Sequence, residues 1–532
     1  MNIWIKLWLF GALEVFAQGE KRWIFFADKG PDWAAAAPET FLSRASLERR
    51  AVQGLSLDFS DYPVCKRYLD ELRARGVRIN RVSRWLNAAS GWAEDWNEIE
   101  KLPFVAGLRP VGVLRAAGDD SLDPLYGAAA AQIRMLELDV LHAAGLTGKS
   151  VLVAVFDDGF RNVNTLPGFA HLFKRGAVKG AYDFVGDDQD VYSDGGHGTN
   201  CFSIMAVYDP GKFVGSSHEA DFWLFRTEDA SSETLREEDN WVAAAEKADS
   251  AGAQVFQTSL GYHKFDNDVG NHQYSDLNGK TAPISKAADA AGAKGIVVVN
   301  SAGNEGAGAW RYITPPADAE HVLAVGSVDE NRNISPFSGR GPTADGRVKP
   351  DICALGGMTV HLNIAGQYAR GFGTSYAAPL IAGMAACLRQ AFPSAKAQDI
   401  FNAIKASGDR ASRPDNDYGH GVANAPKAYL LLAMQYPQTL VQNLAGLEVR
   451  PNPETGVLML RSNTKVRATL VLGGQKRKFV VLGEKQIDLK ALPGATRATA
   501  YKISVKSRSA SAQAFGVFVP PSYLAYSSDD VK

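Results

Sequence analysis

Residues 371–379 have the sequence GFGTSYAAP, with two glycines before Ser375 and small residues and a proline after it. The residues that follow, 380–386, read LIAGMAA and predict a helix. A serine at such a loop-to-helix junction presents its hydroxyl to a substrate, and the helix N-terminus stabilises negative charge that develops beside it. The same pattern is typical of a serine that only caps a helix. The choice between these interpretations depends on other stretches of the chain.

Two of these stretches carry an acid and a histidine. Asp157 ends a continuous apolar run, residues 151–156, and is followed by Asp158 and Gly159. Ligands of open α/β sheets gather at the carboxyl ends of strands, so an acid is well placed there, although Asp-Gly is also a common turn. His197 stands between two glycines before the helical stretch 200–206. Histidine is the usual proton carrier near neutral pH.

A third stretch, SAGNEG at residues 301–306, places Asn304 directly after the apolar run 295–300. Asparagine is a common turn residue, but its side-chain amide can also donate a hydrogen bond to an oxyanion. A serine is a poor nucleophile without a base, and the base needs a partner that holds its tautomer. Asp157, His197, Asn304 and Ser375 therefore supply one residue for each task of acyl transfer.

The surrounding pattern predicts an α/β domain. Apolar runs suited to strands buried on both faces of a parallel sheet occur at residues 151–156, 220–225, 254–258, 295–300 and 322–326. Alanine-rich helical stretches alternate with them, notably at 241–251 and 284–293. This alternation is typical of an open parallel sheet with helices on both faces.

The two ends of the chain differ from this centre. Residues 1–17 are apolar with Lys6 near the start, and we interpret them as a secretory signal peptide, although Glu14 leaves a buried N-terminal strand as the alternative. Residues 18–122 predict a small α/β unit, with strands at 23–26, 77–83 and 104–111 and helices at 41–50 and 68–73. After residue 433 short strands replace the helices, and we expect a small β-sandwich over residues 445–532.

Composition and charge exclude several classes of protein. The 532 residues carry a net charge of −1, which gives no reason to expect nucleic acid as a partner. We also expect no membrane span, because no stretch after the N-terminal segment is long and apolar enough. The four cysteines show no metal-type spacing, so we assign no metal ligands. Cys353 and Cys387 either pair or remain buried thiols.

Taken together, the four stretches resemble the motifs of the subtilisin-like serine proteases, the subtilase family. The chain order Asp, His, Ser is the subtilisin order. The matching segments are residues 153–159, 197–199, 301–306 and 373–379, with further similarity at 259–261, 337–342 and 349–352. The resemblance covers about residues 130 to 430, and four motifs in the right order make it specific.

The resemblance implies a serine endopeptidase and a role for each matching residue. Ser375 is the implied nucleophile, His197 its base and Asp157 the partner of the histidine. Asn304 is implied as the oxyanion donor. An extended polypeptide substrate is expected to pair with the backbone of Ser259, Leu260 and Gly261. No cofactor is implied, and no set of calcium-ligand positions carries over from the family, so calcium stays open.

The flanking regions extend the resemblance. The leader resembles the propeptides of secreted subtilases, which act as folding aids and inhibitors. The tail begins with VRPNP, residues 449–453, similar to the start of the C-terminal secretion-sorting domains of Bacteroidetes proteins. A plain accessory β-sandwich is the alternative. We therefore expect a signal peptide (1–17), a propeptide (18–122), a peptidase domain (123–433) and a β domain (445–532) in a monomer that is secreted or held at the cell surface.

Three positions depart from the family pattern. Asp158 stands where Ser or Thr is usual, Tyr376 replaces a methionine, and Asn200-Cys201 replaces His-Val. None of these changes removes a catalytic group, but Asp158 places a second carboxylate beside Asp157.

Two other functions are consistent with parts of the sequence. A serine esterase would need its acid and histidine after the serine, and Asp415 and His420 do follow Ser375, within a glycine-rich turn. An inactive subtilase-fold binding protein, with the β-rich tail as its working part, is the other alternative. The complete set of four catalytic residues favours the protease over both.

Overall fold

The computed structural model describes residues 22–42 (except 32), 44, 47, 56–110 (except 85 and 94), 123–506 (except 445, 446, 493, 494 and 496), 511–520 and 523. The chain divides into two compact units, residues 1–120 and 121–532. The proposed signal peptide lies outside the described residues, as does most of the helix expected at 41–50. None of the helices in the described ranges is long and apolar enough to cross a membrane.

The N-terminal unit is a four-stranded antiparallel sheet in the order β2-β3-β1-β4, with helices α2 and α3. The elements are β1 (Arg22–Phe26), α2 (Lys66–Ala74), β2 (Arg78–Ser83), β3 (Ala88–Trp92), α3 (Trp96–Glu100) and β4 (Val105–Pro110). A separate apolar core that includes Ile24, Leu72 and Ile99 holds them together. This confirms the expected α/β unit. Strand β3 was not predicted, because its sequence AASGW has none of the β-branched residues that favour strands.

The second unit contains a seven-stranded parallel sheet in the order β13-β12-β11-β10-β5-β9-β6. Its strands are β5 (Leu152–Asp157), β6 (Val178–Asp183), β9 (Asp221–Arg226), β10 (Val255–Thr258), β11 (Val297–Ser301), β12 (Val322–Val328) and β13 (Ile352–Leu355). The five predicted apolar runs all form central strands. The two strands that were not predicted, β6 and β13, are the edges of the sheet.

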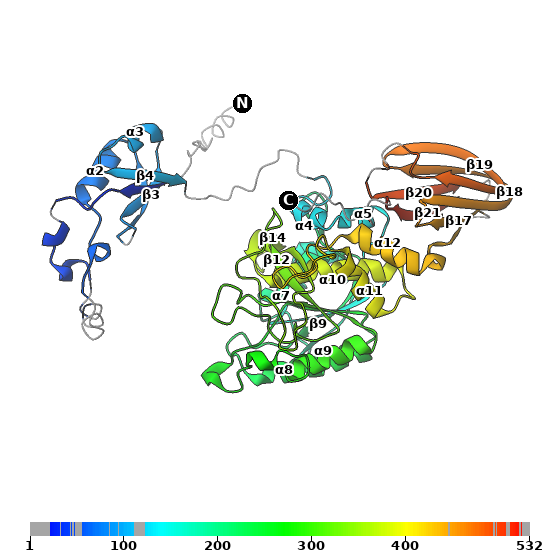
Figure 1. The fold of residues 1–532 in the computed structure, drawn as a ribbon, viewed down its shortest axis with the longest axis horizontal. Helices are drawn as coiled ribbons and strands as arrows, with labels where there is room; N and C mark the ends of the chain where they lie inside the picture. Colours follow the sequence, from blue (N-terminus) through cyan, green and yellow to red (C-terminus); the bar gives the residue numbers. More distant parts are fainter. Residues whose placement is uncertain are drawn as a thin grey trace, which may run out of the picture. The chain divides into compact units, whose positions relative to one another are not determined.

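Helices cover both faces of this sheet, as expected. Helices α8 (Leu235–Ser250) and α9 (Pro283–Ala293) pack on one face, where Trp241 and Ile284 join a core with Phe156 and Phe256. On the other face lie α7 (His197–Ala206) and α10 (Thr374–Ala391), with α11 (Ala397–Ser407) and α12 (Ala425–Gln435) beyond them. Figure 1 shows the green helices α8 and α9 on the opposite side of the sheet from α10.

Helix α10 is the element on which the site depends. Almost all of its residues are buried, and it crosses strands β10, β11, β12 and β13. Gly383 permits this close packing, because a Cβ at that position would lie 2.0 Å from Ser216 Oγ. The N-terminus of α10 is thereby held near the carboxyl ends of the central strands.

The C-terminal part of the second unit is rich in β-strands, as expected, but it has one sheet and not the two packed sheets of the expected β-sandwich. Its strands are β16 (Gln442–Leu444), β17 (Leu447–Asn452), β18 (Val457–Leu472), β19 (Gln475–Asp488), β20 (Thr499–Lys506) and β21 (Ser511–Phe518), and they belong to one hydrogen-bonded sheet. The long strand β18 pairs with β17 near its start and with β20 near its end. Cys353 and Cys387 are free and buried, so of the two alternatives the thiols are correct.

Candidate active site

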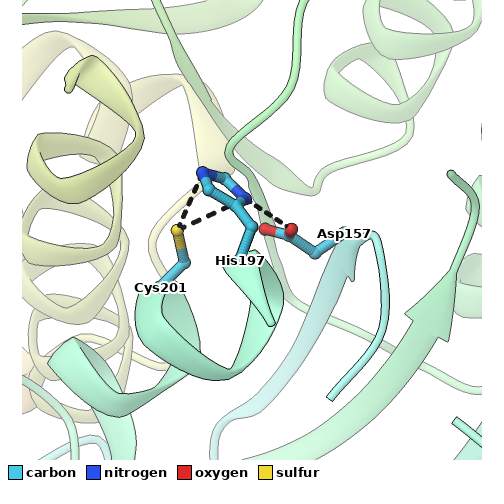
Figure 2. Close-up of side chains that lie close together, drawn as sticks. All are labelled: Asp157, His197 and Cys201. Atoms are coloured by element: carbon cyan, nitrogen blue, oxygen red, sulfur yellow. Dashed lines mark hydrogen bonds and ion pairs between the residues drawn. The ribbon is translucent and has the colours of Figure 1, made fainter. Parts of the chain in front are cut away.

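The centre of the site is a hydrogen bond between two elements that are separate in sequence. Asp157 is the last residue of β5 and is fully buried, and His197 is the first residue of α7. His197 Nδ1 donates to Asp157 Oδ1 over 2.7 Å, since a carboxylate can only accept (Figure 2). The bond fixes the imidazole tautomer and leaves Nε2 to act as a base.

The electrostatics of this pair favour a charged imidazole. Burial alone lowers the pKa of His197, but the adjacent Asp157 carboxylate and its hydrogen bond outweigh that effect. The pKa of His197 is therefore raised well above its ordinary value. An imidazolium is the form that a histidine adopts when it takes a proton from a nucleophile.

Ser375 is the second residue of α10 and is buried apart from 7% of its surface. Its Oγ donates to the backbone oxygen of Ser259 over 3.1 Å, and Ser259 Oγ donates to the backbone oxygen of Ser375 over 2.8 Å. Among the described residues, the contact found for His197 Nε2 is Cys201 Sγ at 3.7 Å, not Ser375 Oγ. Catalytic hydrogen bonds are often unformed in unliganded enzymes and tighten when substrate binds. The structure thus brings serine and histidine to one place without the bond between them.

Asn304 is oriented by the residue that precedes the serine. Its Oδ1 accepts from the backbone nitrogen of Thr374 over 2.9 Å and from Thr374 Oγ1 over 3.0 Å. With Oδ1 engaged, the amide nitrogen remains available as a donor, and Asn304 lines the same cavity as Ser375. Sequence reasoning found Asn304 but missed Thr374 as the group that sets its direction.

The three departures from the family pattern all lie around His197. Asp158 Oδ1 accepts from Gly198 N over 2.8 Å, and its Oδ2 accepts from Gly196 N and His197 N over 3.2 and 3.3 Å. The carboxylate thus caps the N-terminus of α7. The ring centroid of Tyr376 lies 6.3 Å from that of His197.

Cys201 lies one turn after His197 on α7, beneath the imidazole (Figure 2). The ligand-type atoms of Asp157, His197 and Cys201 all lie within 4.8 Å of one another. Cys201 Sγ also contacts the backbone oxygen of Ser375 at 3.4 Å. Its side chain is fully buried, and burial raises the pKa of the thiol. The thiol is therefore a neutral packing group between the histidine and the serine.

Five of the seven predicted site residues line one cavity of about 200 Å³: Ser259, Leu260, Gly261, Asn304 and Ser375. The cavity lies where β10 and β11 end, at the carboxyl edge of the sheet. Leu260 O accepts from Asn300 Nδ2 over 3.0 Å and from Ser301 Oγ over 3.2 Å, so the 259–261 segment is fixed to the neighbouring strand.

The same cavity has polar walls that sequence reasoning did not single out. They come from Glu228, Glu233, Tyr262, Glu305 and Thr314. Glu305 and Tyr262 could have been found, because they directly follow Asn304 and Gly261. No sequence signal connects Glu228, Glu233 and Thr314 to the site, since they lie in loops that only the fold brings together.

The arrangement required for the esterase alternative is not present. His420 Nδ1 contacts the backbone oxygen of Asp351 at 3.1 Å, and Asp415 Oδ1 accepts from the backbone of Asp417 and Tyr418. Asp415 is thus engaged within its own turn and His420 with the backbone of Asp351, and neither residue lines the Ser375 cavity.

Comparisons with known proteins agree with this geometry. The profile of the subtilase family matches residues 148–421, and that of the peptidase S8 propeptide domain of Bacteroidota matches residues 21–119. Serine protease AprX of Bacillus subtilis (strain 168) is 30% identical over 53% of this chain and 66% of its own length. Thermitase of Thermoactinomyces vulgaris is 31% identical over 53% of this chain and 89% of its own length. Subtilisin Savinase of Lederbergia lenta is 29% identical over 56% of this chain and 97% of its own length.

Proposed function

Because this chain belongs to the subtilase family of serine proteases, we propose that it is an endopeptidase that cleaves polypeptides through an acyl-enzyme intermediate. The observation that carries the proposal is the 2.7 Å bond between His197 and the buried Asp157, next to the Ser375 cavity. A binding protein would not need a buried carboxylate that orients a histidine.

Ser375 Oγ attacks the scissile carbonyl after it rotates from Ser259 O towards His197 Nε2. His197 takes the hydroxyl proton and later transfers it to the leaving amine, while Asp157 stabilises the imidazolium and stays ionised. Asn304 Nδ2 and the backbone N–H of Ser375 donate to the oxyanion. The second donor is available because the first N–H groups of a helix have no partner within it. Water then hydrolyses the acyl-enzyme by the reverse sequence.

The thiol of Cys201 and the hydroxyl of Ser375 are the two candidate nucleophiles near His197. We assign this role to Ser375. A cysteine nucleophile needs access to substrate and a lowered pKa. Cys201 has neither, since it is fully buried and burial raises its pKa. Ser375 lines the cavity and stands at a helix N-terminus.

Covalent labelling tests this assignment. A fluorophosphonate should modify Ser375 in the processed protein, as shown by mass spectrometry of the labelled peptide, and His197→Ala should abolish the label. Cys201→Ala is the matched control and should keep it. Label at another residue, or no label on protein that has lost its leader, would contradict the proposed mechanism.

The remaining parts fit an exported zymogen. We propose that residues 1–17 direct export to the outside of the cell or its surface and that residues 18–122 form an inhibitory propeptide. In the same scheme residues 123–433 form the peptidase domain and residues 445–532 an appended β domain. The matched propeptide profile supports this division. All residues with a proposed catalytic role come from one chain, so we propose that a monomer is active.

A further inference from the structure

The β domain differs in charge from the rest of the chain. Residues 445–532 contain 14 lysines and arginines but 6 aspartates and glutamates, which gives them a net charge of +8. The residues before 445 therefore carry a net charge of −9, because the whole chain has −1. A domain with such an excess of positive charge attracts negatively charged partners.

Part of this charge gathers in a hollow of about 720 Å³ on the sheet of the β domain. The lining of the hollow includes four basic residues and no acidic one: Arg467, Lys476, Lys478 and Lys502. None of the four forms an ion pair with another residue in the described ranges. These cations are thus available to a negatively charged ligand.

The register of the strands arranges the cations in rows across one face of the sheet. Lys476 on β19 pairs with Val471 on β18, and Val471 pairs with Lys502 on β20. In the next row Lys478 pairs with Thr469. The alternate residues of β18 point to the opposite face, where they are buried in the core of the domain. The basic rows therefore lie on the outer face of the sheet.

Strand β19 is an edge of this sheet. It pairs with β18 and with no other strand of the described ranges, so half of its backbone N–H and C=O groups point away from the sheet. Four alternate residues of β19 share the outer face: Lys476, Lys478, Val480 and Leu482. Val480 and Leu482 are 44% and 65% exposed. The edge thus presents two cations followed by two apolar side chains.

Protection against aggregation explains only part of this pattern. Lysines on an edge strand discourage pairing with other chains. Exposed apolar residues such as Val480 and Leu482 have the opposite effect, since they favour pairing. An edge with both kinds of side chain instead selects a partner strand that has acidic and apolar side chains in matching places.

We propose that the edge of β19 binds an extended acidic segment of a polypeptide, which adds to the sheet as an antiparallel strand. The strand pairs found in this sheet are all antiparallel. Directly opposite side chains in such a pair lie on the same face. Acidic side chains of the segment therefore pair with Lys476 and Lys478, and apolar ones cover Val480 and Leu482. This site contains no catalytic residue and does not depend on the proposed mechanism.

Binding of matched peptides to the full chain tests the proposal. The protein carries Ser375→Ala, so that it does not cleave them. An antiparallel peptide TLTLTETET places its leucines opposite Leu482 and Val480 and its glutamates opposite the two lysines, and TLTLTQTQT is its uncharged counterpart. We expect fluorescence anisotropy to give a Kd for the acidic peptide about 2- to 30-fold lower, the range for two cross-strand pairs of opposite charge. Equal affinities, or no binding of either peptide, would overturn the proposal.

Variants connect the preference to β19. Lys476→Glu combined with Lys478→Glu should reverse it, so that TLTLTKTKT binds more tightly than TLTLTETET. Lys465→Gln combined with Lys490→Gln is the matched control, because both lysines are exposed in the same domain but lie outside the hollow. The control should keep the wild-type preference. Loss of the preference in the control would show that the overall charge of the domain attracts the peptide, which would overturn the assignment to β19.

Backbone methylation distinguishes strand addition from attraction between charges alone. Alternate N–H groups of an extended peptide point to opposite edges, so TLTLTETET is prepared in two versions, with methyl groups on the threonine nitrogens or on the leucine and glutamate nitrogens. We expect the version whose methyl groups face β19 to lose binding. Binding of both versions as tightly as the parent peptide overturns strand addition. Lysine-dependent binding of dextran sulfate without binding of the peptide would assign the hollow to an anionic polysaccharide, which also overturns the proposal.

Discussion

At the scale of single residues, three neighbouring side chains surround the imidazole ring of His197. Asp157 holds one ring nitrogen, Cys201 packs under the ring, and Tyr376 lies beside it. Catalysis requires a neutral imidazole in the free enzyme, whereas the Asp157 carboxylate raises the pKa of His197. The rate should therefore rise with pH, and the midpoint of the rise should lie above the ordinary histidine value of about 6.5.

We predict this shift in the pH profile of kcat/KM, measured between pH 5 and 10 with a peptide p-nitroanilide that has the uncharged residue norleucine before the scissile bond. Asp157→Asn removes the carboxylate, so the midpoint should move to lower pH while the maximal rate falls by several orders of magnitude. A wild-type midpoint at or below 6.5 would contradict the electrostatic argument. Stability changes with pH in the opposite direction to the rate. His197 binds a proton more tightly in the folded protein than in the unfolded chain, so its contribution to the free energy of unfolding is lost as pH rises through its folded-state pKa.

The principal site residues could be predicted from sequence because each follows a recognisable run. Asp157 and Asn304 come after apolar strands, and His197 and Ser375 stand between or after glycines at helix starts. Their mutual geometry could not be predicted. Whether Ser375 Oγ points to His197 or to Ser259 is a matter of one side-chain rotation, and no pattern of residues encodes it.

At the scale of secondary structure, α7 is held by a residue outside it. Asp158 follows β5, and its carboxylate accepts from three backbone N–H groups at the start of the helix. A carboxylate at this end also interacts favourably with the helix dipole. Asp157 and Asp158 are adjacent at the end of β5. Asp157 therefore orients the ring of His197 while Asp158 binds its backbone N–H, so one strand end positions both parts of the residue.

Asp158→Ala should accordingly destabilise the peptidase unit by about 1–2 kcal/mol, the cost typical of losing a helix cap, and lower kcat because His197 loses its backbone anchor. Thermal unfolding is measured in a Ser375→Ala background, which prevents self-digestion, and kcat in the active enzyme. Asp158→Ser, the residue type usual in the family, keeps a hydroxyl acceptor and should recover part of both losses. Unchanged unfolding and unchanged kcat in Asp158→Ala would show that the cap is not needed.

Strands could be predicted from the sequence where burial on both faces produces a continuous apolar run. Strands β5, β10 and β11 are covered on both faces, so their sequences are continuous apolar runs. The edge strand β6, with the sequence VKGAYD, is only partly buried and gives no such run. Strand β18 was expected as two short strands because the exposed residues 463–465 interrupt its apolar pattern, although the backbone continues through them.

At the scale of the whole molecule, the chain has two units with separate cores. The N-terminal unit has its own sheet and core residues and matches a propeptide profile, while every proposed catalytic residue lies in the second unit. A unit with its own core can remain folded after the chain between the two is cut. This organisation suits an inhibitor that is released by cleavage rather than by unfolding.

We therefore predict that the protein matures by its own activity, with the cut between about Ala116 and Tyr126. Wild-type protein expressed in a protease-deficient host should separate into a leader and a mature enzyme. Ser375→Ala should remain a single chain on a denaturing gel, with the 57.2 kDa of the full sequence less any signal peptide that the host removes. Residues 18–122, produced separately, should then inhibit the mature enzyme in trans, because the separate core lets the leader fold without the rest of the chain. Processing of Ser375→Ala at the wild-type rate would assign the cut to another protease. A leader that folds but does not inhibit would leave the N-terminal unit only a role in folding.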